Sequence, residues 1–290
     1  MIQRKEIVPF IFNKLLSDST RGKTEKIILK LALISFFIHL AVIYLMKFNF
    51  IDYPSNSVLL KNPISAAYTP FSFILIYEVY LLIYYLPRSF TTYITKQYEI
   101  ITLIIIRKLF KDLSALELTE NWFEIKGDLQ FTYDLIASIL LFYLIFLFQK
   151  QKTKQIILQG AIQPMVDKFV KNKKIIAIVL LPLFFIIALY TLADWSAGIY
   201  IFSNKLPTFE SINKLFFDEF FTVLILVDVV LLLFSFFYTD QFHKIIRNSG
   251  FVISTILIRM SFGVSGLIST ILIVVAVLFG WAIITIHNKY

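Results

Sequence analysis

Long apolar runs alternate with short polar stretches along most of this chain. A helix needs about 20 mostly apolar residues to cross a bilayer. Clear runs of that length occupy 27–46, 70–87, 131–149, 174–193 and 219–238. The last run, which ends before His287, is too long for one crossing, and the break at Gly263-Val264-Ser265-Gly266 divides it into spans near 245–262 and 266–286. The pattern therefore predicts an all-α, polytopic membrane protein.

The segment 92–110 is the least apolar of the expected spans. Lys96, Glu99, Arg107 and Lys108 interrupt it, so we expect a helix that its neighbours shield from lipid. It brings the total to eight helices with both termini on one side. Lys and Arg hold loops on the cytoplasmic side, and this count places there both 1–26, with six Lys or Arg, and 150–174, with seven. Without 92–110, the second of these segments would lie outside.

The composition indicates a membrane protein, and the sequence shows few features typical of an enzyme. Hydrophobic residues make up 58% and charged residues 16% of the 290 residues, against about 45–50% and 25% in soluble domains. The net charge of +9 lies mostly in loops, which favours a role in orientation over nucleic-acid binding. There is no cysteine, and no nucleotide-binding, zinc-protease or serine-hydrolase motif occurs. We expect no enzyme, no cofactor and no metal site.

Two amphipathic segments flank the apolar spans. Residues 4–17, inside the N-terminal segment 1–26, and residues 153–170, inside the lysine-rich linker 150–173, mix lysines with Ile, Phe and Leu. Such helices bury an apolar face at the headgroup boundary while their lysines meet anionic lipid. Anchoring to anionic headgroups at the cytoplasmic face is one interpretation, and docking on a protein partner is the other.

The second and third expected spans together resemble the sixth and seventh. Glu78 lies mid-span and is followed 29 positions later by Arg107, while Asp228 is followed 31 positions later by Arg259. In both pairs an Ile-Arg-x-x-Phe element closes the second helix. The chain would then comprise two parallel four-helix units, 27–149 and 174–290, related by an axis along the membrane normal. Chance similarity in a biased composition is the alternative.

An acid in one helix, a short basic loop and an arginine near the end of the next helix resemble the phosphate-starvation-inducible PsiE family. The resemblance is best over 219–287, from Asp228 through Arg259 to the last span. It implies small four-helix membrane units and brings no biochemical activity with it. A multi-pass protein of a bacterial or organellar inner membrane is the expected location, with both termini on the cytoplasmic or matrix side.

Glu78, Arg107, Asp228 and Arg259 are the candidate functional residues. A charged group facing lipid costs about 2.5–3.5 kcal/mol on insertion scales, so these residues should be hidden inside the bundle. They would either form buried ion pairs that fix helix association or line a path for protons or ions. His39 and Glu99 are secondary candidates. We expect His39 to bond to a neighbouring helix and Glu99 to pair with Lys96 near the surface.

Two functional hypotheses follow from these residues. The first is a channel-like or transporter-like protein whose ion or proton path uses the intramembrane acids and arginines. The second is a non-catalytic structural or accessory subunit, within a homo-oligomer or a larger membrane complex, and here the segment 205–219 would dock on a partner. The lipid bilayer itself is the one partner that both hypotheses share.

Overall fold

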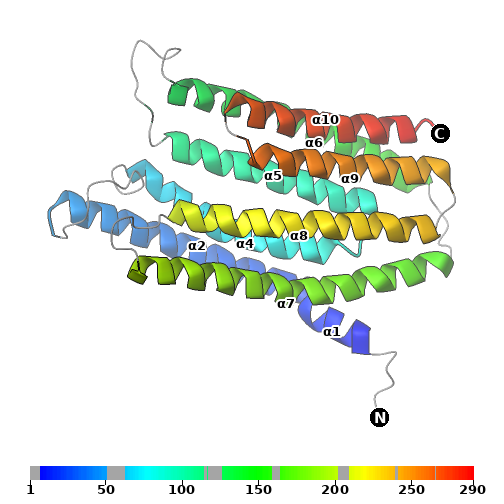
Figure 1. The fold of residues 1–290 in the computed structure, drawn as a ribbon, viewed down its shortest axis with the longest axis horizontal. Coiled ribbons are helices and arrows are strands. Elements are labelled where there is room, and N and C mark those ends of the chain that lie inside the picture. Colours follow the sequence, from blue (N-terminus) through cyan, green and yellow to red (C-terminus); the bar gives the residue numbers. More distant parts are fainter. Residues whose placement is uncertain are drawn as a thin grey trace.

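The computed structural model is an all-α bundle whose long helices run nearly side by side (Figure 1). It describes residues 7–50, 63–113, 116, 126–158, 164–201, 209–238, 241–264 and 266–290, and for some residues inside these helices only the backbone. Eight helices have 18 residues or more, in agreement with the eight expected segments. They are α2 (Asp18–Lys47), α4 (Tyr68–Tyr85), α5 (Phe90–Leu113), α6 (Lys126–Leu158), α7 (Pro164–Ile201), α8 (Phe209–Tyr238), α9 (Phe242–Phe262) and α10 (Leu267–His287). A short helix α1 (Ile7–Leu15) and a 3-10 helix η1 (Pro63–Ala67) complete the described elements.

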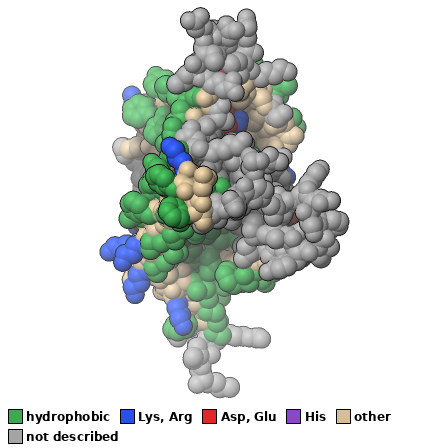
Figure 2. Space-filling view, turned by 90° about the vertical axis from the view of Figure 1, so that its left-hand side faces the viewer, with side chains coloured by type: hydrophobic (Ala, Val, Ile, Leu, Met, Phe, Trp, Pro, Cys, Tyr) green, Lys and Arg blue, Asp and Glu red, His purple; other side chains and the backbone are tan. Residues whose placement is uncertain are grey.

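The described residues form six helical stretches that are long and apolar enough to cross a membrane, from α2, α4, α6, α8, α9 and α10. The chain is therefore a multi-pass helical membrane protein. Its outer surface agrees with this environment. Figure 2 looks onto the bundle from the end away from the termini, and hydrophobic side chains cover much of the described surface there, with only a few separate Lys and Arg side chains.

The eight long helices form two layers of four. In one layer α2 packs on α4, α4 on α5 and α5 on α6; in the other α7 packs on α8, α8 on α9 and α9 on α10. The layers meet through α6 with α10, α5 with α9 and α4 with α7 (Figure 1). Within each layer, helices adjacent in sequence are thus adjacent in space, which is usual for helix bundles.

The connections carry recognisable local signals. The side chain of Ser17 caps α2 by accepting a hydrogen bond from the backbone N–H of Thr20 at 3.1 Å, and Ser89 does the same for Thr92 at the start of α5. Between α9 and α10 the chain turns at Gly266, whose φ of +74° lies in the region that glycine adopts without strain. The break expected at Gly263–Gly266 is confirmed, because α9 ends at Phe262 and α10 begins at Leu267.

Both ends of the described chain lie at the same end of the bundle (Figure 1). This end, called the termini end below, also holds the start of α2, the start of α5, the α8–α9 connection and the end of α10. The opposite end is called the far end.

The amphipathic segments are arranged differently from each other. α1 packs beside α7, and the ammonium group of Lys174 lies 5.1 Å from the centre of the Phe12 ring. The second segment is no separate surface helix in the described residues, because α6 continues to Leu158 and α7 begins at Pro164. Its Gln, Lys, Ile and Leu are compatible with helix, so the two long helices extend past their apolar spans. Residues 159–163 lie outside the described part.

Candidate functional site

The α5 helix directs its polar side chains into the bundle. Its neighbours α4 and α6 flank it, and α9 of the other layer touches it. The polar side chains that it buries are Thr91, Thr95, Gln97 and Thr102. The hydroxyls of Thr95 and Thr102 donate to carbonyl oxygens one turn earlier, at 2.7 and 3.1 Å. Protein therefore surrounds these polar groups of α5, and they need not face lipid.

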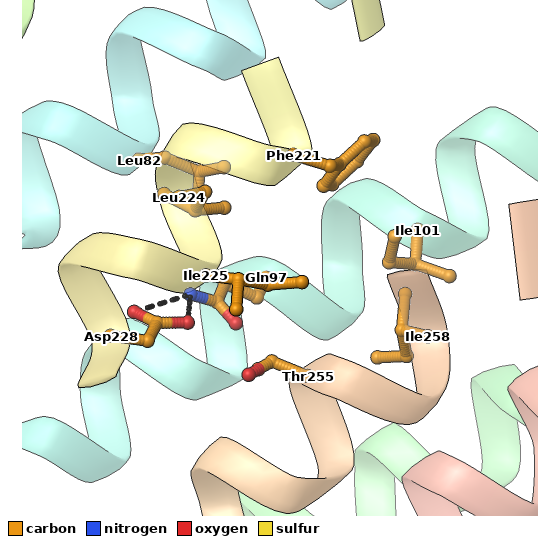
Figure 3. A pocket seen from close by; sticks show the side chains of 9 residues that line it. All are labelled: Leu82, Gln97, Ile101, Phe221, Leu224, Ile225, Asp228, Thr255 and Ile258. Atoms are coloured by element: carbon orange, nitrogen blue, oxygen red, sulfur yellow. Dashed lines mark hydrogen bonds between the residues drawn. The ribbon is translucent and has the colours of Figure 1, made fainter. Parts of the chain in front are cut away.

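Asp228 of α8 has no exposed surface. The side-chain amide of Gln97 donates to both carboxylate oxygens, at 3.1 and 3.4 Å (Figure 3). The hydroxyl groups of Tyr93 and Thr255 are the other polar neighbours of the carboxylate. Asp228 lies ten residues before Tyr238, which is roughly 15 Å along a helix at about 1.5 Å per residue. The acid is therefore deep in the bundle, and its direct partners are neutral.

A small cavity adjoins Asp228 at the junction of four helices (Figure 3). Its free space is on the order of a single water molecule. The polar groups on its wall are Asp228, Gln97 and Thr255. The remaining wall is apolar and consists of Leu82, Ile101, Phe221, Leu224, Ile225 and Ile258.

Part of the apolar wall lies toward the far end of the bundle. Ile101 follows Gln97 by one turn of α5, Ile258 follows Thr255 by one turn of α9, and Leu224 precedes Asp228 by one turn of α8. All three steps lead away from the termini end. Polar groups therefore reach Asp228 from the termini end, and an apolar layer closes the site on the other side.

Lys173 of α7 is the buried cation on the termini side of Asp228. Its side chain is 2% exposed, and its ammonium group donates to the carbonyl oxygen of Arg88 at 3.0 Å. The same ammonium lies 4.7 Å from the centre of the Phe169 ring and 5.4 Å from that of Phe90. Asp228 attracts this charge and Arg247 of α9 repels it. The sequence pattern placed Lys173 in the lysine-rich amphipathic linker 150–173, and only the packing of α7 reveals that it is buried.

Arg247 is buried beside the end of α10. Two of its guanidinium nitrogens donate to the side-chain oxygen of Asn248, at 2.9 and 3.2 Å. A third lies 3.2 Å from Nε2 of His287, whose ring stacks on that of His243. These residues form a basic cluster at the termini end that links α9 to α10.

The four principal candidates occupy separate places. Glu78 is half-buried on α4, under the electrostatic influence of Lys96, Glu99 and Glu25. Arg107 is half-buried near the far end of α5. Arg259 donates to the hydroxyl of Thr222 at 3.5 Å.

Among the described side chains, Glu78 forms no ion pair with Arg107, and Asp228 forms none with Arg259. The structure instead joins Asp228 to Gln97 of the other layer.

An ion-paired acid that the sequence analysis did not single out lies at the far end. Asp134 of α6 is 2% exposed and pairs with Lys108 of α5 at 2.6 Å. Its Oδ1 also accepts hydrogen bonds from Thr270 of α10 at 2.5 Å and from Gln130 at 2.9 Å. The available signal was an acid four residues into the apolar run 131–149, which resembles an ordinary span boundary when the sequence is considered alone.

The secondary candidates lie where the sequence placed them. His39 of α2 is hydrogen-bonded through Nδ1 to the hydroxyl of Thr69 on α4. Glu99 pairs with Lys96 at 2.5 Å, and each side chain keeps about a third of its surface exposed. Gln149 of α6 also donates to Glu99 at 2.9 Å. Both interactions connect neighbouring helices or turns and suit an architectural role.

The described residues contain no group of His, Asp and Glu side chains arranged to hold a metal ion. Of the proposed docking segment 205–219, residues 205–208 lie outside the described part, and for 209–218 the backbone alone is described. Comparisons with models of protein families, with curated proteins and with solved structures found no match to this chain.

Proposed function

We propose that this protein conducts or transports a proton or a small cation through the membrane by way of Asp228. The observation that carries the proposal is a carboxylic acid with no exposed surface, held by neutral donors and adjoining a small cavity. Ionisable groups are expensive inside a membrane protein, and they mark ion or proton paths when a strong structural pairing does not account for them.

The Lys108–Asp134 pair shows what a structural pairing looks like in the same molecule. There an ammonium lies 2.6 Å from the acid, and opposite charges in contact offset each other's loss of water. Asp228 has an amide in that position. An amide stabilises both the charged and the neutral acid, so the group can change its charge without dismantling its surroundings.

The surroundings of Asp228 differ between its two sides along the bundle. Polar groups, including Gln97, Tyr93 and Lys173, lie between the acid and the termini end. Ile101, Ile258 and Leu224 form the apolar layer beyond it. Apolar constrictions gate membrane pathways by excluding water, and so we infer that ions reach Asp228 from the termini end and that exit requires this layer to open.

Reconstitution in liposomes tests the proposal. Liposomes containing a pH-sensitive dye, and a second set loaded with radioactive sodium or a potassium tracer, report proton and cation flux. We expect flux in the wild type and a fall of at least about tenfold in Asp228→Asn, because the amide can neither take up a proton nor balance a cation. Glu78→Gln is the matched control and should retain most of the flux, since Glu78 lies away from the cavity. Equal flux in wild type, Asp228→Asn and empty liposomes would remove the proposal.

We also propose that the two layers derive from a duplicated four-helix unit. Phe71 stacks on Phe110 with ring centres 4.9 Å apart and an interplanar angle of 25°, and Phe221 stacks on Phe262 with the same distance and angle. Each first phenylalanine precedes its acid, Glu78 or Asp228, by seven residues. Matching contacts at matching positions support the repeat, and the similarity to the PsiE family stays a prediction.

The proposed orientation places the termini end in the cytoplasm or matrix. The lysines of 150–174 and those at the start of α2 favour this side by the positive-inside rule. Because the chain has no cysteine, a single cysteine at Lys152 can be labelled selectively. We expect an impermeant thiol reagent to modify Lys152→Cys only after the membrane is opened. Labelling in intact cells would reverse the orientation.

A further inference from the structure

We propose that the ion handled at Asp228 is a proton, and that the positive charge of Lys173 favours its release from Asp228. This inference rests on the proposed function and makes it specific for one ion. It assigns a role to a buried lysine that belongs to none of the ion pairs of the described side chains.

The immediate surroundings of Asp228 suit a proton better than a metal cation. Sodium and potassium need a shell of several oxygen ligands, as other hard cations do, and an ammonium or N–H group cannot serve as one. The group that faces both carboxylate oxygens is the amide nitrogen of Gln97. The adjoining cavity offers space on the order of one water molecule, and most of its wall is aliphatic or aromatic. A proton needs no such shell, because it forms an O–H bond with the carboxylate itself.

Lys173 is connected to the Asp228 site through the first turns of α5. Its ammonium bonds to the carbonyl of Arg88, which precedes α5, and lies near the ring of Phe90 in the first turn. Tyr93 is one turn further, and Gln97, which holds Asp228, follows one turn after that. Residues 88–97 therefore connect the two sites, since the carbonyl of Arg88 binds Lys173 and the amide of Gln97 binds Asp228.

Besides α8 and α7, which carry Asp228 and Lys173, three helices contribute charged or titratable groups around this pair: α5, α9 and α10. Asp228 is influenced by Tyr93 of α5 and by Lys173 of α7. Lys173 is influenced by Asp228 of α8 and by Arg247 of α9. Arg247 has its own partners, Asn248 and His287. Asp228 is thus the negative charge that acts on the buried ammonium.

The two influences on Asp228 act in opposite directions. Loss of water favours the neutral acid, and a nearby ammonium favours the carboxylate. A buried acid without a nearby positive charge would keep its proton. In the cycle that we infer, a proton from the termini side forms an O–H bond at Asp228. The charge of Lys173 then weakens that bond, and the proton leaves when the apolar layer opens.

The first test uses the wild-type protein alone. Proton flux into liposomes should be unchanged when sodium or potassium is replaced by a large organic cation, and no radioactive sodium should enter. Sodium uptake that Asp228→Asn abolishes would overturn the proton assignment while leaving the proposed function intact. Flux that is insensitive to Asp228→Asn would overturn the proposed function itself.

The second test measures the pH dependence of flux in Lys173→Met, which removes the charge and keeps an apolar stem of similar length. Without the ammonium the acid holds its proton more tightly, so the profile should move to higher pH by about one unit, with flux near neutral pH falling by up to about tenfold.

Lys174→Met is the matched control, because the neighbouring ammonium is half-exposed and lies over Phe12. It should leave the profile in place. A folded Lys173→Met protein with the wild-type pH profile would show that Lys173 is only structural. If that variant does not fold, the wild-type ion replacement still decides the identity of the ion.

Discussion

Two buried acids in this protein share three neighbouring residue types and differ in geometry. Asp134 at the far end is surrounded by Lys108, Gln130 and Thr270. Asp228 in the middle of the bundle has Gln97 and Thr255 beside it, and its lysine, Lys173, is held on the carbonyl of Arg88. Each acid thus has one glutamine, one threonine and one lysine.

The position of the lysine separates the two sites. At Asp134 the ammonium is in direct contact at 2.6 Å, and the group joins α5, α6 and α10. At Asp228 the ammonium influences the acid from outside its hydrogen-bonding shell, and a cavity adjoins the carboxylate. The first arrangement is a closed ion pair, and the second leaves a neutral donor and a small cavity beside the acid. Residue type alone therefore does not distinguish an architectural acid from a candidate functional one.

The largest expected difference is in ion flux. Asp228→Asn should lower flux by at least about tenfold with little effect on thermal unfolding in detergent, because asparagine preserves the shape and can still bond to Gln97. Asp134→Asn should do the reverse, since it breaks the ion pair and leaves the path around Asp228 intact. Loss of flux in Asp134→Asn alone would move the functional site to the far end.

The glutamines provide the next comparison. Gln97→Leu removes the observed amide donor to Asp228 and should lower the unfolding free energy by about 3 kcal/mol, the cost of leaving a buried charge poorly bonded. Gln130→Leu should cost about 1 kcal/mol, because Asp134 keeps Lys108 and Thr270. Thermal unfolding followed by helix circular dichroism measures both. An equal loss of stability in the two variants would contradict the view that Asp228 depends on its amide.

The lysine at the far end allows a double-mutant test. Lys108→Met should lower stability by about 2 kcal/mol, less than for a fully buried pair, because the Lys108 side chain is 41% exposed. Adding Asp134→Leu to it should recover most of that loss, since an apolar pair can replace a buried ion pair of similar volume. If the double variant is less stable than Lys108→Met, the pair is more than an ordinary architectural contact.

The threonines should show the smallest difference. Thr270→Val removes the 2.5 Å hydrogen bond to Asp134 and should cost about 1 kcal/mol. The hydroxyl of Thr255 donates to the carbonyl of Val252 at 2.9 Å, which is a local bond within α9. Thr255→Val should therefore change stability by less than about 0.5 kcal/mol and is better detected as a change in flux. A larger stability loss at Thr255 than at Thr270 would reverse the comparison.

Several features of the structure were predictable from the sequence because short-range chemistry determines them. The apolar runs matched the long helices to within a few residues at most of their ends, since lipid selects about 20 apolar residues for each crossing. His39 bonded to the neighbouring helix and Glu99 paired with Lys96, one turn away. The weak span 92–110 became helix α5, which buries neutral polar residues such as Gln97 but leaves the charged Lys96 and Lys108 partly exposed.

The sequence by itself determined the all-α membrane class, the eight long helices and the presence of an acid deep inside α8. The length of an apolar run and the residues that form a turn are local features, and the sequence alone therefore reveals them. Only the tertiary structure decided which charges meet: that Asp228 bonds to Gln97, that Asp134 pairs with Lys108, and that Lys173 is buried beside α5. The physical reason is that such contacts depend on the rotation and height of each helix against its neighbours, which no spacing within one helix specifies.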